Sequence, residues 1–87
     1  MHEINYVVFG SRMTPKGIQR ECDKIAKRYG DYHTPCDQIR FPNVVCKSYK
    51  DAYDWLNAND RDGYDCVAIK YKDDRRTCWL AKIEYHV

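Results

Sequence analysis

The sequence of 87 residues predicts a single α+β domain with the element order β-α-β-α-β-β. Three observations support this prediction: an apolar segment at residues 4–9, a helical pattern directly after it, and two alternating segments within residues 64–87. We expect both helices to pack on one face of a mostly antiparallel sheet. At this length the whole chain, residues 1–87, forms one compact domain with a small core.

The first third of the chain predicts a strand followed by a helix. Residues 4–9 are apolar on both faces, which is typical of a strand that lies centrally in a sheet or is covered on both sides. Thr14 is a candidate N-cap, Pro15 suits the first helical position and Gly30 suits the end, so we expect a helix over residues 15–29. Its apolar stripe consists of Ile18, Cys22, Ile25, Ala26 and Tyr29.

The middle of the chain predicts a loop, a short strand and a second helix. Residues 31–42 include two prolines and form the longest loop, and residues 43–46 form the short strand. Ser48 followed by Asp51 resembles a capping box, which indicates the start of the second helix. Large or apolar residues then recur at helical spacing: Tyr49, Ala52, Tyr53 and Leu56. The Asp-Gly pair at residues 62–63 turns the chain toward the last two strands.

Residues 64–87 predict a hairpin around the charged turn Asp73-Asp74-Arg75-Arg76. In the first strand Val67, Ile69 and Tyr71 alternate with Ala68, Lys70 and Lys72; in the second, Trp79, Ala81, Ile83, Tyr85 and Val87 alternate with Leu80, Lys82, Glu84 and His86. We expect the two more apolar sets to share one face. That arrangement requires paired residue numbers with an even sum and a turn of three or five residues. The lysines then lie on an open, charged face.

The composition is typical of a cytosolic domain. Fifteen Lys and Arg against thirteen Asp and Glu leave a formal charge of +2, which is too small to indicate nucleic-acid binding by itself. No segment approaches the roughly 20 apolar residues of a membrane span, and His2-Glu3 is not the basic start of a signal peptide. We expect a cytoplasmic protein without membrane contact or cofactor. Its cysteines form no C-x-x-C pair and are expected to be reduced and mostly buried: Cys22, Cys36, Cys46, Cys66 and Cys78.

The basic hairpin is a candidate nucleic-acid surface and supplies the alternative function. Its cations are Lys70, Lys72, Arg75, Arg76 and Lys82, and further cations line the outer side of the first helix: Arg20, Lys24, Lys27 and Arg28. Proteins that bind single strands combine cations with stacking aromatic rings. Here the hairpin aromatics fall on the face assigned to the core, and acidic residues interrupt the positive charge. A solvated charged face is therefore the simpler interpretation.

Three weaker candidates concern zinc, catalysis and phosphate. His33 and Cys36 supply half of a zinc site, but the second close pair of ligands is missing. Cys36 with His33 as its base is the candidate nucleophile of a small enzyme, which is the third functional hypothesis. The strand followed by residues 9–12 (Phe-Gly-Ser-Arg) resembles the opening of Rossmann-like nucleotide-binding proteins of the lysine-decarboxylase-like group, which implies an anion site at the first helix. The second glycine-rich loop of such proteins is absent. Because none of the three candidates is complete, we predict no catalytic or metal-binding residue.

Eight tyrosines and two tryptophans favour a protein–protein surface. Short length, mixed charge and the absence of a catalytic set resemble the small inhibitors that phages and mobile elements encode, including anti-CRISPR-like proteins. That resemblance implies a non-enzymatic protein that occupies a surface of a partner protein, such as a defence or nucleic-acid-processing complex. The predicted contact residues are Tyr32, Trp55, Asp73, Asp74, Arg75 and Arg76. The sequence leaves open the oligomeric state and the order of the strands.

Overall fold

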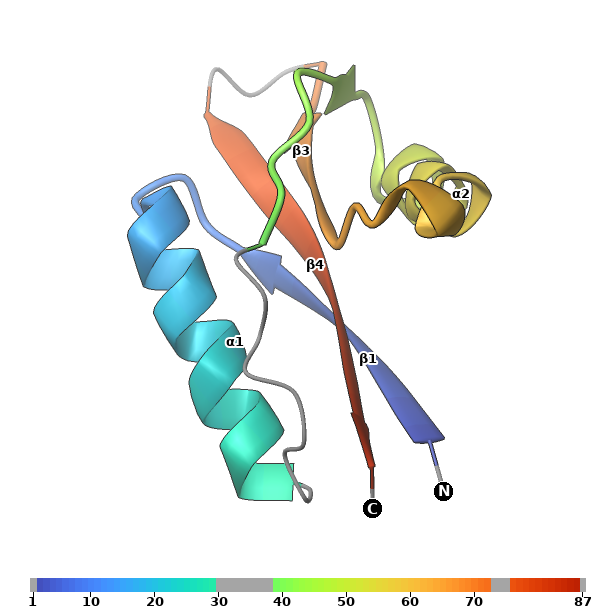
Figure 1. Ribbon diagram of the computed structural model, residues 1–87. Helices are drawn as coiled ribbons and strands as arrows, with labels where there is room; N and C mark the ends of the chain where they lie inside the picture. Colours follow the sequence, from blue (N-terminus) through green and yellow to red (C-terminus); the bar gives the residue numbers. More distant parts are fainter. Residues whose placement is uncertain (1, 30–38, 73–75, 87) are drawn as a thin grey trace.

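The computed structural model describes residues 2–29, 39–72 and 76–86 and confirms the predicted element order (Figure 1). The elements are β1 (His2–Phe9), α1 (Pro15–Tyr29), β2 (Val45–Cys46), α2 (Tyr49–Ala58), the 3-10 helix η1 (Asp60–Asp62), β3 (Cys66–Lys70) and β4 (Thr77–His86). Within the described ranges, the two α-helices accompany one four-stranded sheet. Because most of its strand pairs are antiparallel, the fold is α+β as predicted.

Local signals place both helices as expected. The hydroxyl of Thr14 accepts a hydrogen bond from the backbone N–H of Gly17 (3.1 Å), so Thr14 caps α1. Ser48 caps α2 in the same way, because its hydroxyl accepts from the N–H of Asp51 (3.1 Å). After η1, Gly63 takes a left-handed conformation with φ of 76°, which glycine adopts without a steric cost.

The sheet has the strand order β1-β4-β3-β2, with β1 and β2 at its edges. β1 pairs with β4 and β4 with β3 in antiparallel fashion, whereas β2 runs parallel to β3. The expectation that the apolar segment at residues 4–9 lies centrally, or is covered on both sides, is wrong. β1 is an edge strand, and Ile4 and Val8 remain 48% and 47% exposed.

The predicted register of the hairpin is also wrong. Val67 pairs with Leu80 and Lys70 pairs with Thr77, so the paired residue numbers have an odd sum and residues 71–76 connect the strands. This register places Val67 on the same face as Leu80, and the neighbouring Cys66 on the opposite face with Ala81. The error arose because both faces of β3 are apolar, since residues 66–69 are all buried.

The two helices cover opposite faces of the sheet rather than one common face (Figure 1). On the α1 face, Ile18 and Cys22 of α1 form a core with sheet residues: Cys66, Ala81 and Ile83, with Val7, Phe9 and Trp79 packed beside them. On the α2 face, Ala52 and Leu56 of α2 form a second core, with Cys46, Val67, Ile69 and Leu80. The protein therefore has three layers, with the sheet between α1 and α2.

Candidate interaction surface

Lys82 does not take part in the predicted basic platform on the hairpin. Lys82 is buried, with its side chain only 3% exposed, and its ammonium group forms an ion pair with Asp60 of η1. Lys70 lies on the α1 face of the sheet and Lys82 on the α2 face, because the observed register separates them. Lys70, Lys72 and Arg76 are exposed, whereas Arg75 lies outside the described residues.

The predicted protein contacts are only partly described. Tyr32, Asp73, Asp74 and Arg75 lie outside the described residues. Trp55 is half-buried against the core of the α2 face, and its ring lies 5.4 Å from that of Tyr64, between centroids. The guanidinium of Arg40 stacks over the ring of Tyr64, 4.5 Å from the ring centroid. Trp55 thus takes part in intramolecular aromatic contacts that join α2 to the segment before β3.

Among the described residues, Tyr49, Tyr53 and Tyr6 form a row of aromatic rings at the surface, which we call the tyrosine row. Tyr49 and Tyr53 are 43% and 40% exposed, and their rings are stacked with centroids 6.5 Å apart. Tyr6 of β1 lies against Tyr53 at 4.7 Å between centroids, and its hydroxyl donates a hydrogen bond to Asn57 Oδ1 at 3.1 Å. The row is therefore ordered by its own contacts and remains accessible to solvent.

The exposed side chains of β1 continue this surface. Ile4 and Val8 lie on the same face of β1 as Tyr6, because side chains alternate along a strand. The sheet contacts of α2 fall mainly on β3 and β4, which explains why these two apolar side chains of β1 remain about half exposed. Together, Ile4, Val8 and the tyrosine row form one surface from β1 to the outer side of α2.

Sequence reasoning missed this surface because it placed Tyr49 and Tyr53 on the buried stripe of the second helix. The buried residues of α2 are Ala52 and Leu56, and Trp55 packs beside them at helical spacing. The signal that was available is the spacing of Ala52, Trp55 and Leu56, which defines a stripe without the tyrosines.

Two of the described thiols, those of Cys46 and Cys66, are unsuited to nucleophilic catalysis. Burial, with Cys22 and Asp65 nearby, raises the pKa of the Cys66 thiol to about 12. Burial and the charge of Asp51 also raise the pKa of Cys46. A raised pKa leaves little thiolate near neutral pH, and the thiolate is the reactive form. The candidate nucleophile Cys36 and its base His33 lie outside the described residues.

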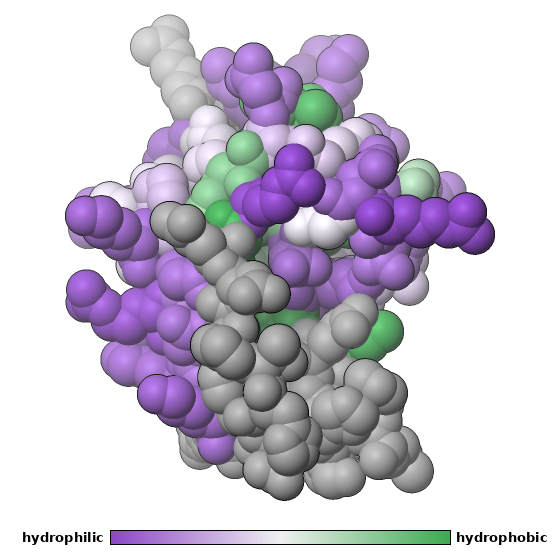
Figure 2. Space-filling view, viewed as in Figure 1, coloured by the Kyte–Doolittle hydropathy of each residue, from purple (hydrophilic) through white to green (hydrophobic). Residues whose placement is uncertain are grey.

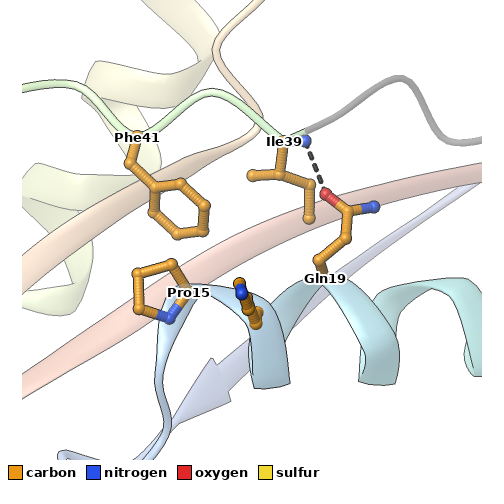
Figure 3. A pocket seen from close by; sticks show the side chains of 5 residues that line it. Pro15, Gln19, Ile39 and Phe41 are labelled. Carbon is orange, nitrogen blue, oxygen red and sulfur yellow. Dashed lines mark hydrogen bonds between the residues drawn. The ribbon is translucent and has the colours of Figure 1, made fainter.

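Neither a metal site nor a preformed phosphate-binding site is found in the described part of the chain. No three His, Cys, Asp or Glu side chains come together there as metal ligands do. At the start of α1, Thr14 already occupies the N–H of Gly17, and Arg12 is exposed. The nearby pocket of about 240 Å³ is lined by Pro15, Lys16, Gln19, Ile39 and Phe41 (Figure 3). In it, Gln19 Oε1 accepts from the backbone N–H of Ile39, so this amide anchors the chain rather than offering a free acceptor.

The outer side of α1 carries a ridge of exposed cations: Arg12 just before the helix, then Lys16, Arg20, Lys24 and Lys27. Hydrophilic side chains cover this side of the molecule (Figure 2). In the described part of the chain, the acidic partner found for this ridge is Glu21, which lies 3.4 Å from the ammonium of Lys24. Such a ridge is what a solvated helix face presents, and it also suits an anionic ligand.

Comparison with known proteins finds no matching family model, no matching curated protein and no matching solved structure. Neither described helix has the length and apolar character needed to cross a bilayer. Functional inference therefore depends on the surface itself.

Proposed function

We propose that this protein is a non-enzymatic, cytosolic binding protein that occupies a surface of another protein through its tyrosine row. The observation that supports this proposal is the exposure of two ordered, stacked tyrosines on α2, beside uncovered apolar side chains on β1. Tyrosine offers a large apolar ring and a hydroxyl with little rotamer entropy to lose, which is why it is enriched in interface cores. The buried, free thiols of Cys46 and Cys66 agree with a reducing compartment.

The partner class that we propose is a host defence or nucleic-acid-processing complex, as the resemblance to small phage-encoded inhibitors implies. Inhibitors of this kind need a surface rather than a catalytic centre. The tyrosine row provides such a surface, and acidic and basic side chains flank it on α2, including Lys50 and Asp54, which are both exposed. Mixed charge at the rim of an apolar patch is typical of a transient protein interface.

Site-specific photocrosslinking tests this proposal directly. A photoreactive amino acid at position 53 should capture a defined protein in host cells, whereas the same amino acid at position 24, on the outer side of α1, should not. With that protein purified, Tyr49→Ala should weaken binding by at least tenfold, equivalent to about 1.4 kcal/mol. Lys24→Ala is the matched control and should bind normally. Equal capture from both positions, or unchanged affinity of Tyr49→Ala, would contradict the proposal.

Nucleic-acid binding is the second candidate, and the cation ridge of α1 supports it better than the hairpin does. Lys82 is buried in its ion pair, whereas Lys16 and Arg20 are exposed. Binding through the ridge predicts an affinity for labelled RNA or DNA that falls steeply with salt, because neutralised phosphates release counterions. Lys16→Glu with Arg20→Glu should abolish it, and Lys70→Glu on β3 should have little effect. A salt-independent affinity would exclude this second function.

A further inference from the structure

Within the described residues, no strand pairs with the outer edge of β1, where every second residue points its backbone groups away from the sheet. The N–H of Lys82 donates to the carbonyl of Asp65 (2.7 Å), so the backbone groups of Lys82 face the β3 side of β4. Because these directions alternate along a strand, those of Ala81 and Ile83 face β1. Their partners on β1 are Val7 and Asn5, which therefore face β4. The residues between and beside them point their N–H and C=O groups away from the sheet: Ile4, Tyr6 and Val8.

This edge is complementary to itself. When two copies of β1 run antiparallel about a twofold axis at Tyr6, Ile4 of one copy lies opposite Val8 of the other, and Tyr6 lies opposite Tyr6. Ile4, Tyr6 and Val8 then form hydrogen-bonded pairs, and each of these side chains meets an apolar or aromatic partner. A shift of two residues places Ile4 opposite either Tyr6 or Gly10, so one apolar pair is lost. The residue pattern thus favours a single symmetric register.

The edge also lacks the features that keep edge strands apart. Natural monomers protect such strands with lysine, proline, a bulge or a covering element. Residues 4–9 contain no charged residue and no proline, and they pair with β4 without interruption. Tyr6 contacts α2, but Ile4 and Val8 on either side of it remain about half exposed. Pairing of this strand with a second copy of the same chain would satisfy its outward backbone groups and remove the half-exposed side chains of Ile4 and Val8 from water.

We propose that two copies of this chain associate through β1, antiparallel and centred on Tyr6, into one continuous sheet that contains the four strands of each copy. The twofold axis is perpendicular to the sheet, so both α2 helices lie on the same face. With strands about 4.8 Å apart, and α2 over β3 and β4, the two helices stand roughly 20 Å apart. This is about twice the contact distance of packed helices, so the helices do not collide.

The dimer has a consequence for the surface described above. The two tyrosine rows meet at the axis through Tyr6 and form one continuous aromatic strip with Tyr53 and Tyr49 at each end. Ile4 and Val8 of both copies form the apolar floor between the α2 helices. A dimeric partner would engage both halves of this strip at once and gain avidity. The dimer itself does not depend on the proposed partner and is tested without it.

A charge-swap series tests both the dimer and its register. Light scattering and analytical ultracentrifugation over a wide concentration range should show a dimer for the wild type. Ile4→Lys/Val8→Lys places lysine opposite lysine and should give a monomer. Ile4→Lys/Val8→Glu places lysine opposite glutamate and should restore the dimer, because positions 4 and 8 face each other only between copies. Val45→Lys, at a position 60% exposed on the other edge strand, is the control and should remain dimeric.

Each outcome decides the proposal. Circular dichroism and melting curves must show that the lysine variants are folded, which is expected because Ile4 and Val8 are about half exposed. A wild type that is monomeric at every concentration overturns the dimer, and so does a dimer that the double lysine variant leaves intact. If the lysine–glutamate variant stays monomeric, the register centred on Tyr6 is wrong. Tyr49→Ala should remain dimeric while losing partner binding, which separates this inference from the proposed function.

Discussion

The α1 face and the α2 face of the sheet are covered by helices of different length. The fifteen residues of α1 extend about 22 Å, whereas the ten of α2 extend about 15 Å, less than half of the roughly 33 Å of β4. On the α1 face, Val7 and Phe9 of β1 are packed against the core. On the α2 face, Ile4 and Val8 stay exposed. The comparison shows that the exposed apolar side chains of the candidate surface lie where the shorter helix leaves the sheet uncovered.

The largest expected effect tests whether both faces stabilise the fold equally. Ile18 of α1 and Leu56 of α2 are both fully buried, so Ile18→Ala and Leu56→Ala should each lower the free energy of unfolding by about 3 kcal/mol. Urea denaturation measures both, with Val45→Ala at an exposed position as the control. A negligible cost for Leu56→Ala would mean that α2 is only loosely attached.

The next effect concerns the buried ion pair on the α2 face. Asp60→Asn removes the charge opposite Lys82, whose ammonium is shielded from water, and should cost about 1–2 kcal/mol of unfolding free energy. Asp54→Asn, at an exposed position on α2, should change stability by less than about 0.5 kcal/mol. Lys82→Met should cost less than Asp60→Asn, because Asp60 is largely solvated and tolerates the loss of its partner. The reverse order would show that the lysine stabilises the fold by its charge.

A further effect, which is confined to alkaline pH, concerns the buried thiols of the two faces. In the unfolded chain Cys66 loses its proton near its ordinary pKa of 9.0, whereas the folded protein retains it up to about 12. The unfolded state therefore binds fewer protons above pH 9, so stability should fall by up to about 1.4 kcal/mol per pH unit as the pH rises through this window.

Replacement of the thiols separates this contribution from those of other groups. Cys66→Ala should flatten the decline measured by urea denaturation at stepwise pH. Cys46→Ala, at the α2 face, should also flatten it, because burial and the charge of Asp51 raise the pKa of Cys46. Identical slopes for the wild type and Cys66→Ala would contradict the assignment.

The smallest effect concerns the caps of the two helices. Thr14→Ala and Ser48→Ala each remove a side-chain acceptor for a helix N–H and should cost about 1 kcal/mol or less. Since α2 is shorter, Ser48→Ala should also increase hydrogen exchange along α2 more than Thr14→Ala does along α1. Equal protection of both helices in the two variants would indicate that packing alone holds α2 in place.

Most secondary structure was predictable from local signals, whereas the candidate surface was not. Thr14, Ser48 and Gly63 act locally, so the start of each helix and the turn before β3 were placed correctly. Tyr49 and Tyr53 were assigned to a buried stripe because their helical spacing suits a core as well as a surface. Their exposure depends on where α2 sits relative to β1, and that position is a long-range property.

The sequence by itself determined the element order, the caps, and which residues of each strand share a face. Only the tertiary structure decided the register of β3 against β4, the placement of the helices on opposite faces, the burial of Lys82 and the edge position of β1. The physical reason is that alternation separates the two faces of a strand without saying which face is buried. In β3 both faces are apolar, so either register was compatible with the sequence pattern, and the packing of two helices selected one.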